Sequence, residues 1–530
     1  MDQNSSIRKL FFTIATGILL LALSLNSCRK DDELRWDSDL LVPIMHSSLD
    51  VWDIFGDTNV VENADQSMKL LIEETIDMLD PDKVIQVHDT LSAELFNIPL
   101  YLEYFPGDQL IKKVNSVAMD LGDMELTLAR ARVATMKFYV TNTIQRRLRV
   151  KYEMLSSEKD GKHFEIIEDV DAATASGPSY SVKTIHLDGY DINMTGIDGM
   201  QVNTVVSQTT VWLHPDADSI WITPDDTVLI ISTFDELKVE YARGYFGEQN
   251  YLGSGSSFMD VFGNFKSGSF DLDHVNAQLK ISNYTGMDVR MSLDKLSSYN
   301  NENHQEVMLN DPLIGSPLNI RRAIEKGPTL DDVLPSIEFY QMNQSNLDEL
   351  IENRPDSLRF DLSALINPLG NVSSGNDFMY FEKGILASIG LEIPLNFSAD
   401  NLRIEDFSTM NFDDDGRLKS GKLIAYVDNM FPFDLDIQFY ILNEKREIVD
   451  SLFTEKNHIP SGVIDANGFV KMPSKNVLTI PLSQEKIELL RKYSDMLIRA
   501  EMNSAGNKTY QLYQNYNLDI RIVGDVKYEL

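Results

Sequence analysis

Leu423–Phe439 (LIAYVDNMFPFDLDIQF) is the stretch that decides the fold of this chain. Apolar or aromatic residues stand at alternate positions on both arms around Asn429, and mostly polar residues lie between them. Alternation with a period of two is typical of a half-buried β-strand. The stretch therefore predicts two strands that form a hairpin, with its turn at Asn429 and Pro432 close by.

The same pattern occurs three times in the sequence. MKFYVTNTIQRRLRVKY occupies residues 136–152 around Asn142, and AQLKISNYTGMDVRMSL occupies residues 277–293 around Asn283. The asparagines are 141 and 146 residues apart, and each interval is the length of one ordinary domain. We therefore expect a mainly β fold with three tandem β-sandwich-like domains.

A second shared element follows each predicted hairpin, namely a strand, a short helix and another strand. In the last repeat Ser483 can cap a helix at Gln484–Arg491, and in the middle repeat Ser345 precedes a helix at Leu347–Ile351. The matching stretch of the first repeat, Ile192–Met200, is less regular and contains two glycines. We expect one short helix in each domain.

These patterns give a predicted division of the chain. The ranges are 1–27 for a signal peptide, 28–106 for a tether and N-terminal packing segment, and 107–244, 245–395 and 396–530 for the three β-domains. We expect the tether to pack soon onto the first domain. Tyr245–Gly268, which contains the run Gly253–Ser257, and Asn396–Asp400 are the predicted linkers.

The order of these elements resembles a known β-sandwich family. Strand, asparagine turn and strand, then Ile480-Pro481-Leu482-Ser483 before a short helix and a strand, is similar to the water-stress and hypersensitive-response domain of late-embryogenesis-abundant proteins. The best match is Gly421–Ala500. That family favours Asn-Pro at the turn, and Asn429-Met430 departs from it, as do the other two asparagine turns. The resemblance implies a fold and no function. An immunoglobulin-like sandwich is the alternative.

The N-terminus resembles a bacterial lipoprotein signal. Arg8 and Lys9 precede an apolar run from Leu10 to Leu25, and Ser27 stands directly before Cys28, the only cysteine. A helix of sixteen residues covers roughly 24 Å, which is short of the ~30 Å hydrocarbon core, so this run is typical of a signal peptide. The lipobox resemblance implies that Cys28 becomes the lipidated N-terminus, with several acyl chains as a membrane anchor. The alternative is a cysteine of no consequence.

The residues after Cys28 resemble the export signal of Bacteroidetes-type surface lipoproteins. Lys30, Asp31, Asp32 and Glu33 follow the cysteine closely. This resemblance implies an outer-membrane lipoprotein displayed on the cell surface. The alternatives are a merely solvated, charged tether and a location on the periplasmic face.

Composition restricts the classes of partner. The formal net charge is −35, and nucleic-acid binding needs clustered Lys and Arg, so no nucleic-acid partner is expected. The same negative charge disfavours attraction to anionic lipid head groups, so attachment to a membrane is assigned to the lipid on Cys28. At 43% hydrophobic residues the chain has ample material for packed cores without a disulfide.

The sequence contains no constellation that predicts catalysis. There is no Gly-x-Ser-x-Gly, no His-Glu-x-x-His and no phosphate-binding loop, and the eight histidines have no metal-ligand spacing. We expect no catalytic residue, no cofactor and no metal site. A hydrolase using paired carboxylates is the least favoured class, because context singles out no pair.

Two features carry weak functional content. Trp212 and Trp221 flank a short turn and could pair across a hairpin, where they would either contact a glycan or lie in the core. Asp-Ser/Thr-aliphatic triplets resemble the O-glycosylation sequon of the same bacterial group, and a modified hydroxyl would have to be exposed. The candidate hydroxyl residues are Thr90, Ser219, Thr227, Ser357 and Ser451.

The sequence therefore favours a non-enzymatic protein-binding or scaffolding lipoprotein whose partner is an envelope or extracellular protein. The alternative is a surface glycan-binding protein.

Overall fold

A computed structural model describes residues 37–56, 59–79, 81–85, 90–98, 101–259, 261–342, 345–411 and 418–529. The fold is mainly β, as predicted. The chain forms two compact units. Among the described residues, one consists of residues 37–54, 264–269 and 398–529, and the other of residues 55–263 and 270–397. The Cys28 region and the predicted signal peptide lie outside the described residues.

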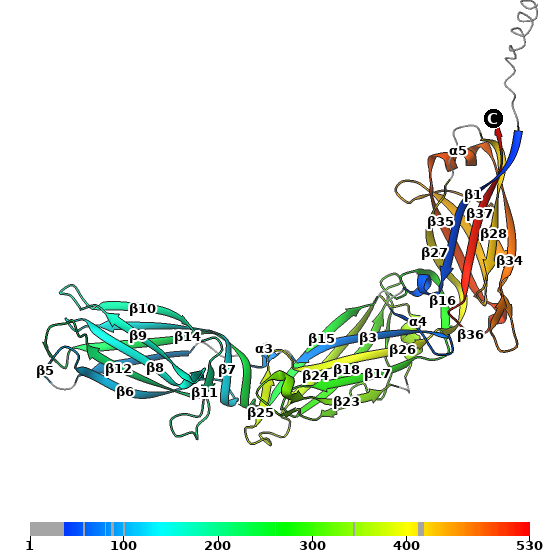
Figure 1. Cartoon of the computed structure of the whole chain (residues 1–530). Helices are drawn as coiled ribbons and strands as arrows, with labels where there is room; N and C mark the ends of the chain where they lie inside the picture. The colour runs from blue at the N-terminus through cyan, green and yellow to red at the C-terminus, as the bar shows by residue number, and fades with distance from the viewer. Residues whose placement is uncertain are drawn as a thin grey trace, which may run out of the picture. The chain divides into compact units, whose positions relative to one another are not determined.

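The C-terminal sandwich consists of two sheets (Figure 1). The first has the order β1 (Asp37–Asp50), β37 (Asn517–Glu529), β28 (Leu418–Asn429), β34 (Ser474–Leu482). The second has the order β16 (Phe265–Leu272), β27 (Asn396–Thr409), β35 (Asp495–Ser504), β29 (Phe433–Leu442), β30 (Ile448–Ser451). The alternating apolar residues of β28 and β29, such as Val427 and Ile437, are fully buried between them.

The middle sandwich repeats this plan. Its first sheet has the order β2 (Val60–Glu62), β3 (Met68–Leu79), β26 (Ile385–Pro394), β17 (Asn276–Asn283), β23 (Ser336–Gln341). Its second sheet has the order β15 (Gln249–Phe258), β24 (Ser357–Ile366), β18 (Val289–Tyr299), and β18 also pairs with β19 (Glu306–Met308) and β20 (Leu318–Ile320).

The first sandwich has the same order of strands. One layer has the order β4 (Thr90–Asn97), β14 (Thr227–Tyr245), β7 (Glu125–Asn142), β10 (Ser179–His186). The other has the order β6 (Gln109–Ala118), β12 (Thr204–Leu213), β8 (Leu148–Lys159), β9 (Lys162–Val170). The short strand β11 (Asp191–Asn193) pairs with both β7 and β8 and joins the two layers.

The N-terminal segment does not behave as the predicted tether. Its first strand, β1, pairs with β37 of the C-terminal sandwich, then β3 pairs with β26 of the middle one, and β4 pairs with β14 of the first. Each strand adds to the same side of an equivalent sheet, next to the last strand of that sandwich. The expectation that 28–106 is a short tether that soon packs onto the first domain holds for β4 alone, because β1 and β3 fill sheet edges of the other two sandwiches.

The predicted hairpins are also corrected. β28 and β29 lie in different sheets, and the same is true of β17 and β18. The asparagine turn thus carries the chain from one sheet to the other. Apolar alternation is the same for a hairpin and for this arrangement, since both arms face one core, so periodicity does not distinguish the two.

The predicted helices are found in two of the three domains. α5 (Gln484–Lys492) begins after Ser483, whose Oγ accepts a hydrogen bond from the backbone N–H of Lys486 at 3.2 Å. α4 (Leu347–Glu352) begins after Asn346 instead of Ser345. In the first sandwich the equivalent stretch holds β11 and no helix is described there.

Strands occupy much of the first predicted linker and all of the second. Gly253–Ser257 lies inside β15, which pairs with β24 along its whole length, and Asn396–Asp400 begins β27. The glycines and serines of β15 suggested a loop because they have low strand propensity. Pairing with β24 overrides that propensity.

A fully buried asparagine fixes each sheet-to-sheet turn. Asn429 Nδ2 donates to the carbonyl oxygens of Phe433 at 2.9 Å and Pro460 at 3.0 Å, and its Oδ1 accepts from the backbone N–H of Phe431 at 2.9 Å. Asn142 and Asn283 make the same three bonds. Each donates to the carbonyl oxygen four residues on and to a more distant one, of Asp171 or Arg321, and each accepts from the backbone N–H two residues on. The amide group satisfies backbone groups that the turn would otherwise leave unpaired.

We expect Asn429→Asp to destabilise the C-terminal sandwich by about 3 kcal/mol or more, because a buried carboxylate would face two carbonyl oxygens and lose both donor bonds. Calorimetric unfolding of the full chain measures this. Asn467→Asp, at an exposed position of the same sandwich, is the control, with an expected cost of less than about 0.5 kcal/mol. Equal effects of the two variants would contradict the role of Asn429.

Candidate functional sites

An exposed aromatic pair lies beside a small sheet of the first sandwich. β13 (Ile220–Ile222) pairs with β5 (Leu102–Tyr104), and the ring of Trp221 stacks on that of Tyr101 with centroids 4.9 Å apart and 25° between the planes. The two residues are 51% and 61% exposed. Exposed stacked rings leave two outer apolar faces in solvent, a feature that often marks a binding surface.

Trp212 lies elsewhere, so the predicted pairing of the two tryptophans is not found. Trp212 belongs to β12, where it stands opposite Gln109 and Arg149, and its side chain is half-buried. Sequence analysis missed Tyr101 as the partner because Tyr101 is 120 residues before Trp221, in the segment assigned as a tether.

The proposed sequon residues are not strongly exposed. Ser219, Thr227, Ser357 and Ser451 are all partly buried. Thr227 pairs with Thr143, whose Oγ1 donates to the Thr227 carbonyl at 3.1 Å, and the Ser451 hydroxyl donates to the Phe453 carbonyl at 2.9 Å. Thr90 is the first residue of β4, and its side chain is not among those that the structure describes. Lys30, Asp31, Asp32 and Glu33 lie outside it too.

A seam of aromatic and charged residues joins the first two sandwiches within their common unit. β25 (Asp377–Tyr380) of the middle sandwich pairs with the end of β14. Tyr241, Phe378 and Tyr380 pack in one buried cluster there. The Tyr380 hydroxyl donates to Glu325 at 3.0 Å, and Glu325 also pairs with Arg243. The domains predicted at 107–244 and 245–395 thus share a core contact.

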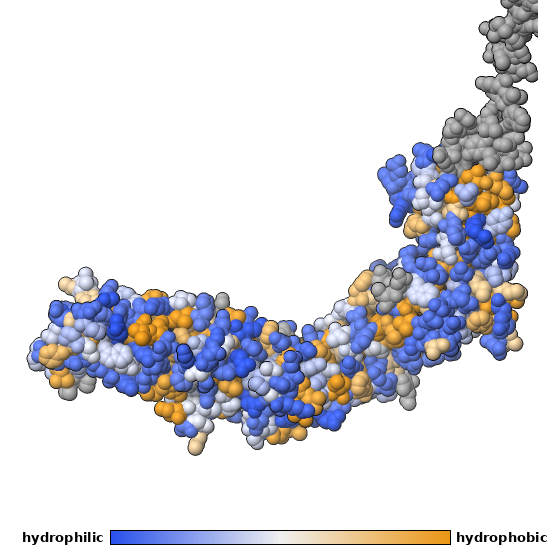
Figure 2. Space-filling model, in the orientation of Figure 1, coloured by the Kyte–Doolittle hydropathy of each residue, from blue (hydrophilic) through white to orange (hydrophobic). Residues whose placement is uncertain are grey.

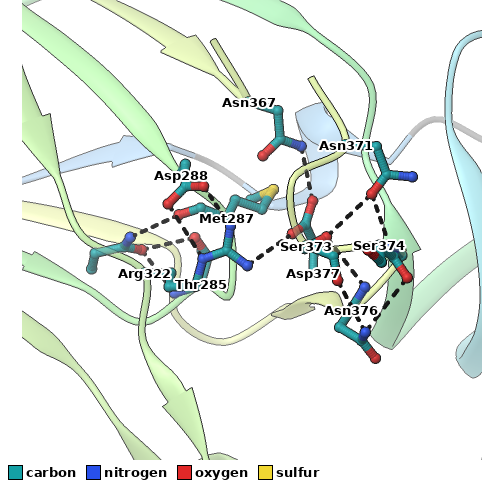
Figure 3. A network of polar contacts seen from close by, with 12 residues as sticks. Thr285, Met287, Asp288, Arg322, Asn367, Asn371, Ser373, Ser374, Asn376 and Asp377 are labelled. Carbon is teal, nitrogen blue, oxygen red and sulfur yellow. Dashed lines mark hydrogen bonds and ion pairs between the residues drawn. The ribbon is translucent and has the colours of Figure 1, made fainter. Parts of the chain in front are cut away.

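A buried polar network supports the loop that leads into β25 (Figure 3). Asn367 Nδ2 donates to Asp377 Oδ2 at 2.9 Å and to the Gly247 carbonyl at 3.2 Å. Arg322 lies between two acids: it pairs with Asp288, and its Nη1 is 3.7 Å from Asp377 Oδ1. Asp377 Oδ1 and Asn367 Oδ1 are buried without a hydrogen-bond partner.

The burial of Asp377 changes its titration. Burial raises the pKa of its carboxyl above the ordinary 3.8, against hydrogen bonds from Ser373 and Asn367 and the charge of Arg322. A raised pKa means that ionisation disfavours the folded state. This group contributes stability that is complete below the unfolded pKa and is lost as pH rises through the folded one.

Within the residues described, no three His, Cys, Asp or Glu side chains are grouped to hold a metal ion. A hollow of about 680 Å³ lies in the first sandwich beside Arg130, Lys159 and His163. Arg130 is paired with Asp191 at 2.7 Å, and Lys159 donates to the Asp188 carbonyl at 2.7 Å, so these cations already have partners.

No protein family and no curated protein matches the chain. A candidate secreted protein from Parabacteroides distasonis, of solved structure, is 12% identical, with a TM-score of 0.28 over 54% of this chain and 90% of that one. PBCV-1 VP54, fitted into a reconstruction of the virophage Sputnik, is 9% identical, with a TM-score of 0.10 over 62% and 98%. TM-scores this low carry no argument about this chain.

The described residues contain no helix that is long and apolar enough to cross a membrane. Figure 2 shows hydrophilic residues over much of the visible face, with apolar residues in separate patches.

We expect Asp377→Asn to reduce the loss of stability of its unit as pH rises from about 4, because the amide stays neutral throughout. Calorimetric unfolding of the full chain at a series of pH values measures the slope of the free energy of unfolding against pH. Asp361→Asn, at an exposed position on the neighbouring β24, is the control. Parallel slopes for wild type and Asp377→Asn would contradict the assignment.

Proposed function

We propose that this protein is a non-enzymatic lipoprotein of the outer membrane, anchored through Cys28 and displayed at the cell surface, that binds or scaffolds an envelope or extracellular protein. The observation that carries the proposal is the position of β1. This strand begins at Asp37, nine residues after Cys28, and pairs with the last strand of the chain.

The short interval restricts where the C-terminal sandwich lies. Nine extended residues span at most about 30 Å. A lipid on Cys28 therefore holds this sandwich close to the membrane surface, and the lipid and the export-like residues Lys30, Asp31 and Asp32 together specify the location. The anchor is connected to a strand that is hydrogen-bonded to β37, and this arrangement suits a protein that must hold a partner in place.

The first sandwich offers a surface for a protein partner. The outer face of the sheet that contains β4, β14, β7 and β10 carries two cross-strand rows of mostly apolar residues. These rows are Leu95, Leu229, Thr141, Tyr180 and Ala93, Ile231, Tyr139, Val182. Leu95, Tyr180 and Val182 are exposed. Apolar patches of this kind favour association with other proteins.

Protease treatment of intact cells tests display. We expect an antibody against the C-terminal sandwich to lose its signal, and we expect Cys28→Ser to move the protein out of the membrane fraction. Replacing Lys30, Asp31 and Asp32 by Ala should retain the anchor and restore protection from protease. Protection of the wild type in intact cells, with digestion after lysis, would contradict surface display.

The same cells test binding. A membrane-impermeant cross-linker should join the wild type to a defined envelope protein, and Val182→Glu should remove that product. Met200→Glu, at an exposed apolar position outside the two rows, should retain it. No product in the wild type, or equal loss in both variants, would count against a protein partner on this face.

A second candidate function is glycan binding, favoured by the exposed Tyr101–Trp221 stack. Outer ring faces of this kind pack on the apolar faces of sugar rings, and nearby Glu103, opposite Trp221 in β5, offers an acceptor for hydroxyl groups. This candidate uses Trp221 and not Trp212.

For the glycan candidate, we expect Trp221→Ala to weaken retention on a polysaccharide gel about 2- to 10-fold, the range for loss of one aromatic stacking contact. Tyr180→Ala, which removes an exposed tyrosine from β10, is the control. Absence of retention on every polysaccharide tested would remove this candidate.

A further inference from the structure

A buried carboxylate lies in the first sandwich, on the side where β4 and β6 form the edges of its two layers. Glu94 of β4 is 8% exposed and stands opposite Ile230 of β14, which is 3% exposed, so the strand directs Glu94 into the core. Its Oε1 accepts a hydrogen bond from Asn115 Nδ2 of β6 at 2.7 Å. Its Oε2 is buried and has no hydrogen-bond partner among the described residues. One oxygen of this carboxylate is therefore unsatisfied inside the sandwich.

Two buried hydroxyl groups of β12 lie in the same region. Ser207 and Thr209 are 3% and 1% exposed, and their hydroxyl oxygens also have no hydrogen-bond partner in the described part of the chain. The two residues are two positions apart on one strand, so both face the core, as the buried Val211 does. Ser207 pairs directly with Asn115, the residue that donates to Glu94. The three unsatisfied oxygen atoms thus belong to strands of both layers, which Asn115 connects.

The surroundings of Tyr152 place the carboxylate and the hydroxyl groups near one another. Tyr152 of β8 pairs with Thr209, and its side chain is buried. Burial raises the pKa of the Tyr152 hydroxyl to about 12, the neighbouring hydroxyl groups of Ser207 and Ser232 act against the rise, and the charge of Glu94 adds to it. Glu94 and Ser207 therefore both lie within range of the same phenol, across the core.

The chain supplies no counter-charge for this carboxylate. Glu94 forms no ion pair with a basic residue in the part of the chain that the structure describes. Lys113 of β6 pairs with Thr209, but its side chain is exposed and its Nζ lies 5.5 Å from the centroid of the Phe96 ring. A buried carboxylate without a positive partner costs more free energy than its one hydrogen bond offsets.

The chemistry of the three unsatisfied atoms suits a hard cation. All three are oxygens, from one carboxylate and two hydroxyl groups, and oxygen atoms are the ligands of hard cations. A single carboxylate balances one positive charge, whereas protein sites for Ca²⁺ gather several carboxylates. A water molecule would satisfy the hydrogen bonds and leave the negative charge unbalanced. A monovalent ion therefore fits these atoms better than water or a divalent ion does.

We propose that Glu94, Ser207 and Thr209 form a binding site for a monovalent cation of the Na⁺ type inside the first sandwich. The ion is held between β4 and β12, so it fastens a strand of the N-terminal segment to the opposite layer. The site uses one acid and two hydroxyl groups, and it is thus distinct from a cluster of three acids or histidines. The inference goes beyond the proposed function, and it depends on neither the lipid anchor nor a partner protein.

Hydrogen exchange of the chain from residue 28 onward, carrying Cys28→Ser, tests the site. The protein is compared in about 0.15 M NaCl and in choline chloride of equal concentration, so that screening is the same and only the cation differs. Choline is too large to enter the core. We expect the amides of β4 and β12 to exchange at least about threefold more slowly in NaCl, because a bound ion opposes local opening. Amides of β34, in the C-terminal sandwich, should exchange equally in both salts.

Three variants assign the effect to its atoms. Glu94→Gln keeps an oxygen that accepts from Asn115 and removes the charge, so the difference between the two salts should disappear. Ser207→Ala with Thr209→Val keeps the carboxylate and removes both hydroxyl groups, and it should reduce the difference. Glu158→Gln removes the same charge at an exposed position of β8 and should retain the full difference.

Sodium NMR gives a direct readout of binding. The sodium signal should be broader with the parent chain than with an equal concentration of Glu94→Gln, and as broad with Glu158→Gln as with the parent chain.

The parent chain decides the proposal even where a variant fails to fold. Equal exchange of β4 and β12 in the two salts would overturn it, and Lys113 or water would then be the partner of Glu94. Slower exchange on adding a calcium salt, with none on adding NaCl, would assign the site to a divalent ion and overturn the proposal too. Loss of the difference in Glu158→Gln would reduce it to a general effect of net charge.

Discussion

The hydrogen bonds of one buried asparagine per sandwich are the interaction on which the rest of the structure depends. Asn142, Asn283 and Asn429 stand where the chain leaves one sheet and enters the other, and each amide ties three backbone groups together. Without this amide the turn would bury unpaired carbonyl oxygens between two apolar sheets. The free-energy cost of burying such groups exceeds the stabilisation that most single contacts provide. With it, the strands on both sides keep the register that directs their alternating apolar residues into one core.

The N-terminal segment adds a second constraint, because it contributes one strand to a sheet of each sandwich. β1 pairs with β37, so the first strand described needs the last one as its partner. The middle and first sandwiches receive β3 and β4 from the same segment. Contacts of such large sequence separation form late in folding, since the entropy of closing the loop must be overcome first.

The fold could be predicted from the sequence to the extent that its signals are local. Alternation around Asn429 predicts both strands, and Ser483 before Gln484 predicts a helix that the structure contains. Partners that are far apart leave no such signal. Nothing in the sequence of β1 indicates that β37 is its partner strand. Nothing near Trp221 indicates that its ring stacks on Tyr101, which is 120 residues earlier. The buried state of Asp377 likewise follows from the loop that Asn367 and Arg322 fix around it, and composition alone would place this acid at the surface.

These constraints together suit a lipid-anchored protein. If Cys28 carries lipid as proposed, tension from the membrane enters the fold through β1. It acts along a strand that is paired with β37 from Asp37↔Glu529 to Asp50↔Asn517. Backbone hydrogen bonds loaded along the strand share the force, whereas an anchor attached through an exposed loop would load a few bonds at a time. The segment then continues into β3 and β4, so under this proposal the stretch next to the anchor would also close sheets of the sandwiches that would hold a partner.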